Sequence, residues 1–314
     1  MKSLFLSSLF FICLLLSKLY GLGVNGIVAF GDSLSCNGNA CIYALEPADI
    51  CIIYPQGRFT DGDVWLEVLA DELDLPRPRP SLAGGYNFAY GGATTGWDIS
   101  TNLLNVGHQV EAYLQRVGGQ ADPRSLYVLW VGGNDIKNKI IPKSLIPNLK
   151  KHITELARAG AKTFLIPNYP PLAKTPLISG AAGVLGWGLA AIGDYFQFEG
   201  TATIRQSFSM YADQAADFGI QTLNRQLKHM LLELEQSLQI TIYHFDAYTL
   251  FHEVTNNLHA FGLSENDHLF LYDGFHPSRV VHRILGQEAY KFLNEPKVFR
   301  KSPVQNQKKR KGEN

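Results

Sequence analysis

The distribution of hydrophobic residues along the chain constrains its fold more than any other feature of the sequence. Short runs rich in β-branched and aromatic residues alternate with longer segments whose apolar residues recur at helical spacing. This alternation is typical of a parallel sheet covered by helices, because each crossover between parallel strands needs a long connection, usually a helix. The predicted strands are residues 27–30, 86–89, 126–131, 163–166 and 240–245.

The segments between these strands include four clear helical patterns, at residues 63–73, 144–159, 211–238 and 277–293. Pro277 is expected in the first turn of the last helix, where a missing N–H costs nothing. No linker interrupts the alternation, and the proline-rich stretch 76–80 is short enough to be an ordered connection. We therefore expect one domain over residues 24–296.

Both ends of the chain have the composition of segments outside the fold. Residues 1–23 combine Lys2, an apolar run over 4–16 and small residues near position 23, which predicts a secretory signal peptide. An uncleaved anchor is the less favoured alternative. Residues 297–314 hold seven basic residues and one acidic residue, and we expect a disordered tail. The apolar, Gly-rich segment 177–200 is interpreted as a buried helix pair or, alternatively, as a lid that contacts lipid.

The charges and cysteines limit the partners of the domain. The whole chain has 28 Lys+Arg and 28 Asp+Glu, but residues 24–296 carry 19 basic against 27 acidic side chains, which argues against nucleic-acid binding. Export leaves Cys36, Cys41 and Cys51 in an oxidising compartment. Cys36 and Cys41 are near enough to close a small loop, and the pairing stays open. No Cys or His spacing suggests a metal site, and no cofactor is expected.

Ser33 is the first candidate for chemistry, in the sequence Gly31-Asp32-Ser33-Leu34-Ser35 directly after the first predicted strand. In an open parallel sheet, ligands bind beyond the carboxyl ends of the strands. A serine at this place is also a common helix cap, so the position alone is weak support.

Asp273 and His276 are the partners that a serine nucleophile would need. A hydroxyl requires a base to take its proton, and the base requires a carboxylate to orient it. Gly274 permits a bend between the two residues and Pro277 follows at a predicted helix start. A turn-forming aspartate and a helix cap would explain the same segment. The pairs His244 with Asp246 and Asp267 with His268 receive little weight, because neither lies in a comparable motif.

Two glycine-bearing segments follow the second and third predicted strands and supply candidates for an oxyanion hole. Gly132-Gly133-Asn134 offers backbone N–H groups and a side-chain amide, and Gly91-Gly92 lies in the segment 87–95. Acyl transfer needs such donors where negative charge develops on the substrate oxygen.

These four segments together resemble the ordered sequence blocks of the GDSL, or SGNH, hydrolase superfamily. The resemblance covers residues 27–293, and Arg58-Phe59-Thr60-Asp61-Gly62 adds to it. It implies a flavodoxin-like three-layer α/β/α sandwich with a five-stranded parallel sheet. It also implies Ser33 as nucleophile, Asp273 and His276 as its partners, and Ser33, Gly92 and Asn134 as oxyanion donors, with Gly91 as the alternative to Gly92.

The function expected from this resemblance is a secreted serine esterase that acts on acyl esters through an acyl-enzyme. Lipid esters are the favoured substrate class, covering lipase, phospholipase A or lysophospholipase activity, with acyl transfer as a second outcome. Residues 177–200 and the basic tail would suit contact with a membrane surface. A carbohydrate O-acetyl esterase and a non-catalytic extracellular binding module are the alternatives.

Overall fold

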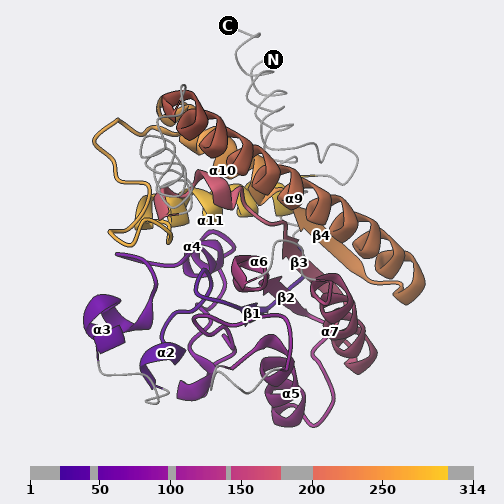
Figure 1. The fold of residues 1–314 in the computed structure, drawn as a ribbon. Coiled ribbons are helices and arrows are strands. Elements are labelled where there is room, and N and C mark those ends of the chain that lie inside the picture. Colours follow the sequence, from indigo (N-terminus) through magenta and orange to yellow (C-terminus); the bar gives the residue numbers. More distant parts are fainter. Residues whose placement is uncertain (1–21, 43–48, 98–103, 139–142, 178–200, 296–314) are drawn as a thin grey trace, which may run out of the picture.

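The computed structural model describes residues 22–42, 49–97, 104–138, 143–177 and 201–295. Its centre is a parallel sheet in which the strands follow one another in chain order. The strands are β1 (Gly26–Gly31), β2 (Ser125–Trp130), β3 (Thr163–Pro167) and β4 (Thr241–Phe245). All three pairings are parallel, and each strand lies at a position predicted from its hydrophobic run (Figure 1).

The remaining predicted strand, residues 86–89, is an extended segment beside β1 and forms only an isolated bridge to it. Ala29 donates to the Tyr86 carbonyl and accepts from Phe88, both through the backbone. The Asn87 side chain donates to the Ser35 carbonyl and to Asn37. With this segment on the outer side of β1, the order of extended segments is flavodoxin-like.

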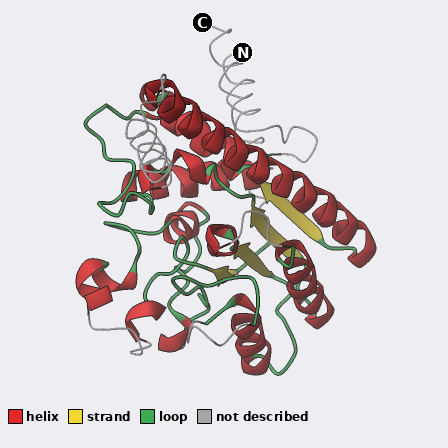
Figure 2. Cartoon of the chain, in the orientation of Figure 1, coloured by secondary structure: helices red, strands yellow, loops and turns green. Residues whose placement is uncertain are grey.

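Helices cover both faces of the sheet, which gives the predicted three layers (Figure 2). One face packs against α5 (Val106–Arg116), α7 (Leu145–Ala159) and α9 (Thr201–Leu238). The other packs against α4 (Trp65–Glu72), α10 (Ala247–Asn256) and α11 (Arg279–Asn294). Because successive strand residues point to opposite faces, Val28 and Phe30 belong to the first core and Ile27 and Ala29 to the second.

The predicted helices are present, with corrections at their boundaries: α9 begins at Thr201, ten residues before the predicted start, and α4 begins at Trp65. α11 begins at Arg279 with Ser278 as its N-cap, so Pro277 precedes the helix and does not occupy its first turn. The reason is local: Pro277 makes an antiparallel bridge to Phe270, which holds it in extended backbone. On α11, the buried His282 accepts a hydrogen bond at Nδ1 from the Trp65 N–H, at 3.1 Å, and so holds the first turn of α4 against α11.

Several predictions fall on residues that the structure leaves undescribed. These are most of the signal peptide (1–21), the apolar segment beyond Leu177 (178–200) and the basic tail with Pro296 (296–314). Among the described helices, none combines the length and the hydrophobicity that crossing a bilayer requires.

Candidate active site

The end of β1 presents Ser33 in a tight turn built around Asp32. The Asp32 carbonyl accepts from the N–H groups of Ser35 and Cys36, and its carboxyl group accepts from the Leu34 N–H at 3.1 Å. Burial, outweighing the Leu34 bond and reinforced by the nearby charge of Asp135, raises the pKa of Asp32 to about 7. Ser33 itself is only 6% exposed, so its hydroxyl lies beneath the surface at the carboxyl end of the sheet.

The loop before α11 places the side chains of Asp273 and His276 next to each other. Gly274 has φ +65°, a left-handed conformation that a residue with a Cβ adopts only with strain. The Asp273 Oδ1 atom accepts from the backbone N–H groups of Phe275 and His276, at 2.8 and 2.9 Å. The carboxylate therefore organises its own loop as well as contacting the imidazole.

Ser33, His276 and Asp273 form a continuous hydrogen-bonded chain. His276 Nε2 lies 2.9 Å from Ser33 Oγ, and His276 Nδ1 lies 2.6 Å from Asp273 Oδ2. The three residues come from opposite ends of the domain, and the serine and the histidine are separated by 243 positions in the sequence. This is the arrangement in which an imidazole takes a hydroxyl proton while a carboxylate fixes its tautomer.

Tyr54 is a member of the site that sequence reasoning missed. Its hydroxyl donates to Asp273 Oδ2 at 2.7 Å, and its ring lies 5.6 Å from the imidazole of His276, centroid to centroid. The ring of Phe59 contacts both, at 4.5 Å from Tyr54 and 5.1 Å from His276. Partial burial alone would raise the pKa of Asp273, but the bonds from His276, Phe275 and Tyr54 hold that pKa far below its usual range.

Of the predicted oxyanion donors, Ser33 and Asn134 share a pocket, and Gly92 lies in a turn that is bonded to Asn134. Asn134 lies on α6 (Gly133–Asn138) and lines the same pocket as Ser33. Its side-chain amide donates to the Ala93 carbonyl at 3.0 Å, which joins it to the turn that contains Gly92. Gly92 has φ +77°, whereas a Cβ on Gly91 would collide with the Phe59 ring at 2.2 Å. Packing against Phe59 thus requires Gly91 to be glycine, and the turn itself requires Gly92.

Asp135 joins the start of α6 to the segment that follows Gly92, and it was not predicted as part of the site. Its carboxylate accepts from the Thr95 hydroxyl at 2.6 Å and from the Thr95 N–H at 3.0 Å. Burial raises the pKa of Asp135, and the two bonds from Thr95 oppose that shift. The sequence signal was its position directly after Asn134 in the third motif.

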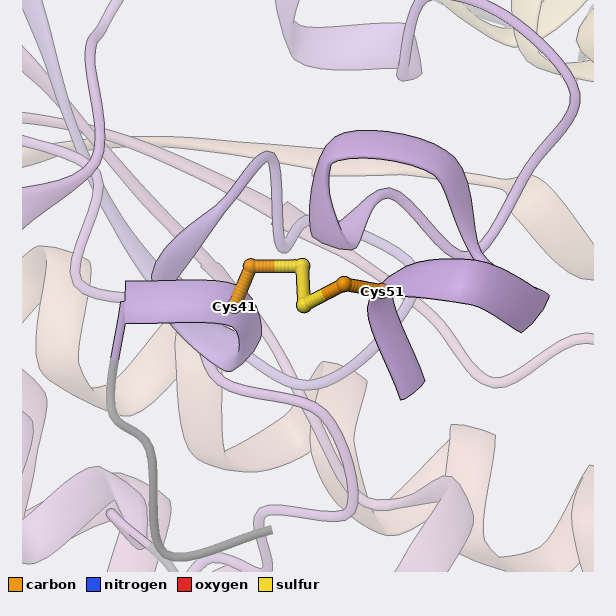
Figure 3. The surroundings of a disulfide bond; sticks show 2 residues. All are labelled: Cys41 and Cys51. Carbon is orange, nitrogen blue, oxygen red and sulfur yellow. A yellow bond between two sulfur atoms is a disulfide. The ribbon is translucent and has the colours of Figure 1, made fainter. Parts of the chain in front are cut away.

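The structure settles the cysteine pairing differently from the loop considered above. Cys41 of α2 (Asn39–Ile42) and Cys51 of α3 (Asp49–Ile53) form the disulfide, and Cys36 is a free, buried thiol (Figure 3). Cys36 packs in a small core with Ala89 and Tyr90 beneath the Ser33 turn. Its side chain is therefore buried in this core and is not paired with Cys41.

A pocket opens beside Ser33 and Asn134 at the carboxyl end of the sheet. Its walls are mainly apolar, with Leu34, Tyr169, Leu172, Phe251, Phe270 and Phe275 among them. The side chains come from several elements far apart in sequence, so the hydrophobic pattern gave no sign of it.

The other titratable pairs considered from sequence lie apart from this chain of hydrogen bonds. Asp246 caps α10 by accepting from Thr249, and burial lowers the pKa of the neighbouring His244 to about 4. Asp267 accepts from Ser264 in an exposed turn. Within the described ranges, no group of three or more His, Cys, Asp or Glu side chains is placed to bind a metal ion.

Comparison with known proteins decides the family. The model of the family described as GDSL-like lipase/acylhydrolase matches residues 27–289, most of the chain. This chain is a member of that GDSL family. The match spans every predicted motif, from Ser33 to His276.

Individual relatives of this GDSL protein are more distant. It is 31% identical to Lipase 1 of Photorhabdus luminescens over 163 residues, which are 49% of this chain and 23% of the lipase. It is 30% identical to the phosphatidylcholine-sterol acyltransferase of Aeromonas hydrophila over 162 residues, 48% of this chain and 46% of that protein. The aligned region is thus less than half the length of each relative.

A solved structure of a lipolytic G-D-S-L family protein from Veillonella parvula is also similar. It has 16% sequence identity and a TM-score of 0.45, and covers 85% of this chain and 97% of its own.

Proposed function

We propose that this GDSL protein hydrolyses carboxylic acyl esters, with Ser33 as nucleophile. The observation that carries the proposal is the linkage of Ser33 Oγ, His276 and Asp273 through contacts of 2.9 and 2.6 Å. Membership of a family described by lipase and acylhydrolase activity supports it. A purely structural or ligand-binding role would not require a nucleophile, a base and an orienting carboxylate in hydrogen-bonded order.

In the proposed mechanism, His276 Nε2 removes the Ser33 proton as Oγ attacks the ester carbonyl carbon. The negative charge that develops on the carbonyl oxygen is bound by the N–H groups of Ser33 and Gly92 and by the Asn134 amide. An amide nitrogen carries two N–H groups, and the bond to Ala93 uses one of them. The protonated His276 then gives its proton to the departing alcohol, leaving an acyl-enzyme on Ser33.

A second nucleophile completes the reaction. Water, activated by His276, attacks the acyl-enzyme and releases the carboxylic acid together with free Ser33. An alcohol that reaches the same carbonyl would accept the acyl group instead, and the similarity to an acyltransferase of Aeromonas hydrophila is the reason to test this outcome. The Asp273 carboxylate keeps the imidazole in the tautomer that both steps need.

We infer further that the ester belongs to a lipid. The apolar pocket beside Ser33 suits an acyl chain better than an acetylated sugar, whose hydroxyl groups would lose their water against walls of Leu and Phe. Exposed apolar side chains also occur near Asp273: Tyr272 is 75% exposed, and Leu177 is bonded through its N–H to the Gly274 carbonyl. These residues would be compatible with contact to aggregated lipid.

A substrate panel tests both parts of the proposal. Short-chain acyl esters, triacylglycerol, phospholipid, lysophospholipid and acetylated sugars are offered to the wild type and to Ser33→Ala. We expect turnover of lipid esters by the wild type only, with unchanged thermal unfolding of the variant. Turnover by Ser33→Ala would refute the catalytic assignment, and a preference for acetylated sugars would refute the lipid assignment.

A second variant tests the acyl pocket directly. Leu172→Trp fills part of the pocket, so the ratio of kcat/KM for an octanoyl ester to that for an acetyl ester should fall about tenfold. Because both esters are measured on one preparation, the ratio does not depend on the amount of folded protein. An unchanged ratio would show that acyl chains lie elsewhere.

We also propose that the protein is exported. The charged start and apolar run of residues 1–23 support this, and a disulfide between Cys41 and Cys51 suits an oxidising compartment. The mass of the protein recovered from outside the producing cells tests the proposal: an N-terminus near residue 24 is expected, and retention of the whole chain inside the cell would contradict it.

A further inference from the structure

The Asp273 carboxylate accepts four hydrogen bonds, and their donors come from two different parts of the chain. Three of them, from Phe275 N, His276 N and His276 Nδ1, arise within its own loop. The fourth comes from the Tyr54 hydroxyl, 219 residues earlier in the chain. Tyr54 and His276 donate to the same oxygen, Oδ2, at 2.7 and 2.6 Å. Tyr54 thus bonds a segment from the N-terminal half of the domain to this carboxylate.

The segment that carries Tyr54 is anchored on both sides. Tyr54 follows α3 directly, and the disulfide between Cys51 and Cys41 joins α3 to α2 (Figure 3). Downstream, the turn at Gly57 lies so close to Cys41 that a Cβ on Gly57 would be 3.1 Å from the Cys41 Sγ atom.

α2 is in turn fixed to the edge of the sheet. The buried Asn39 amide donates to the carbonyl oxygens of Asn87 and Ala89, at 2.8 and 3.0 Å, in the extended segment beside β1. A continuous set of contacts therefore runs from the edge of the sheet through Asn39 and the disulfide to Tyr54.

We propose that Tyr54 is a positioning residue of the catalytic triad, held in place by the Cys41–Cys51 disulfide, and that its hydroxyl sets the orientation and basicity of the Asp273–His276 pair. The proposal rests on the esterase function proposed above and extends it to a residue outside the family motifs.

The physical basis is competition for one oxygen. A hydroxyl bonded to Oδ2 withdraws part of the negative charge that would otherwise stabilise protonated His276. Removal of the hydroxyl leaves Oδ2 a stronger acceptor for His276 Nδ1, so the imidazole holds its proton to a higher pH. The carboxylate also loses a tie that limits its rotation. The first effect moves the acidic limb of the pH profile upward, and the second lowers kcat.

The other charged or titratable groups around His276 are present in both proteins, and of these only Tyr272 also loses an interaction with the Tyr54 hydroxyl. They are Tyr272 on its own loop, which stacks on Tyr54, His282 on α11, the Asp61–Arg279 pair and Asp32 beside Ser33. Burial and the neighbouring His276 lower the pKa of His282 to about 3, so it stays neutral across the profile. Asp32 can contribute to the acidic limb, but Tyr54→Phe removes nothing that contacts it.

The test is the pH dependence of kcat/KM for a short-chain chromogenic ester. Tyr54→Phe keeps the ring against Phe59 and removes only the hydroxyl. We expect its acidic limb to move up by about half a pH unit and kcat to fall about fivefold, with little change in KM. Tyr86→Phe, which removes an exposed hydroxyl near β1, is the matched control and should match the wild type. An acidic limb in Tyr54→Phe that coincides with that of the wild type overturns the proposal, because lost packing alone reduces the amount of active protein without moving the limb.

The role of the disulfide is tested by a double-mutant cycle. Removing it by Cys41→Ser with Cys51→Ser should move the limb in the same direction, and adding Tyr54→Phe should then produce almost no further shift. If the cysteine variant does not fold, the comparison is made on native wild type and native Tyr54→Phe before and after mild reduction. If the shifts of the acidic limb caused by the two changes add independently, the proposal that the disulfide holds Tyr54 in place is overturned. Failure of the proposed function itself is recognised separately, because it would appear as activity in Ser33→Ala.

Discussion

Replacement of Asp273 by asparagine should have a large effect on catalysis, because the structure requires this side chain to accept hydrogen bonds at both of its oxygen atoms. All four groups bonded to this carboxylate are donors: two backbone N–H groups on Oδ1, and His276 Nδ1 and the Tyr54 hydroxyl on Oδ2. An amide has only one oxygen, so its NH₂ group must face donors on one side. Keeping both backbone bonds places the NH₂ group against His276.

In that orientation His276 can accept at Nδ1 only by moving its own proton to Nε2. Nε2 is the atom that lies 2.9 Å from Ser33 Oγ, and once protonated it can no longer take the serine proton. In serine hydrolases of known mechanism this substitution lowers kcat about 10⁴-fold, which corresponds to roughly 5 kcal/mol of transition-state stabilisation. We expect a loss of this size for Asp273→Asn at pH 7.

The assay is steady-state hydrolysis of a chromogenic ester, with circular dichroism to confirm the fold. Asp267→Asn is the matched control, since it removes the same charge from an exposed aspartate whose hydrogen-bond partner is Ser264. Its kcat should stay within about twofold of the wild type. A folded Asp273→Asn variant that loses less than about tenfold would refute the reasoning from tautomers.

Three further predictions concern the oxyanion hole and the stability of the domain. Asn134→Ala should lower kcat by about 10²- to 10³-fold with little change in KM, because one oxyanion donor is worth about 3 kcal/mol in the transition state; equal kcat would exclude the amide from the hole. Glu67→Ala should cost roughly 3 kcal/mol of unfolding free energy, since it leaves the half-buried Arg58 without the bidentate partner at 2.7 and 2.9 Å; denaturant unfolding measures this. The pKa of His282 is about 3 in the folded protein and about 6.5 in the unfolded chain, so below pH 6.5 protons bind preferentially to the unfolded chain. The free energy of unfolding should therefore be about 2 kcal/mol lower at pH 5 than above pH 6.5. Melting temperatures of the wild type and His282→Gln between pH 5 and 7 test this, and parallel curves for the two proteins would contradict it.

The sheet could be predicted from sequence because its strands are buried on both faces and appear as short continuous apolar runs. Residues 86–89 have the same composition, but Asn87 uses its side chain to bond Ser35 and Asn37, and the segment pairs with β1 only at one bridge. α5 and α10 were not predicted. The buried face of α5 contains Gly107 and Gln109, and the Gln109 side chain bonds the Gly31 N–H and carbonyl. Because these buried residues are not apolar, the buried face of α5 does not show as a hydrophobic pattern.

The contacts that join Ser33, His276 and Asp273 could be predicted because each residue lies in a short motif whose chemistry is recognisable without the fold. The contact of Tyr54 with Asp273 could not, because it joins residues 219 positions apart, and Tyr54 follows a disulfide whose pairing the sequence left open. The apolar pocket beside Ser33 could not be predicted for the same reason: Leu34, Leu172 and Phe251 are ordinary apolar residues until the chain brings them together.

Covalent labelling with a fluorophosphonate tests the central claim most directly. The probe reacts with a serine only where a base has activated the hydroxyl and donors stabilise the phosphoryl oxygen. Peptide mapping of the labelled wild-type protein should show a single adduct on Ser33, and labelling should be lost in His276→Ala. An adduct on another residue, or equal labelling of Ser33 without His276, would contradict the account.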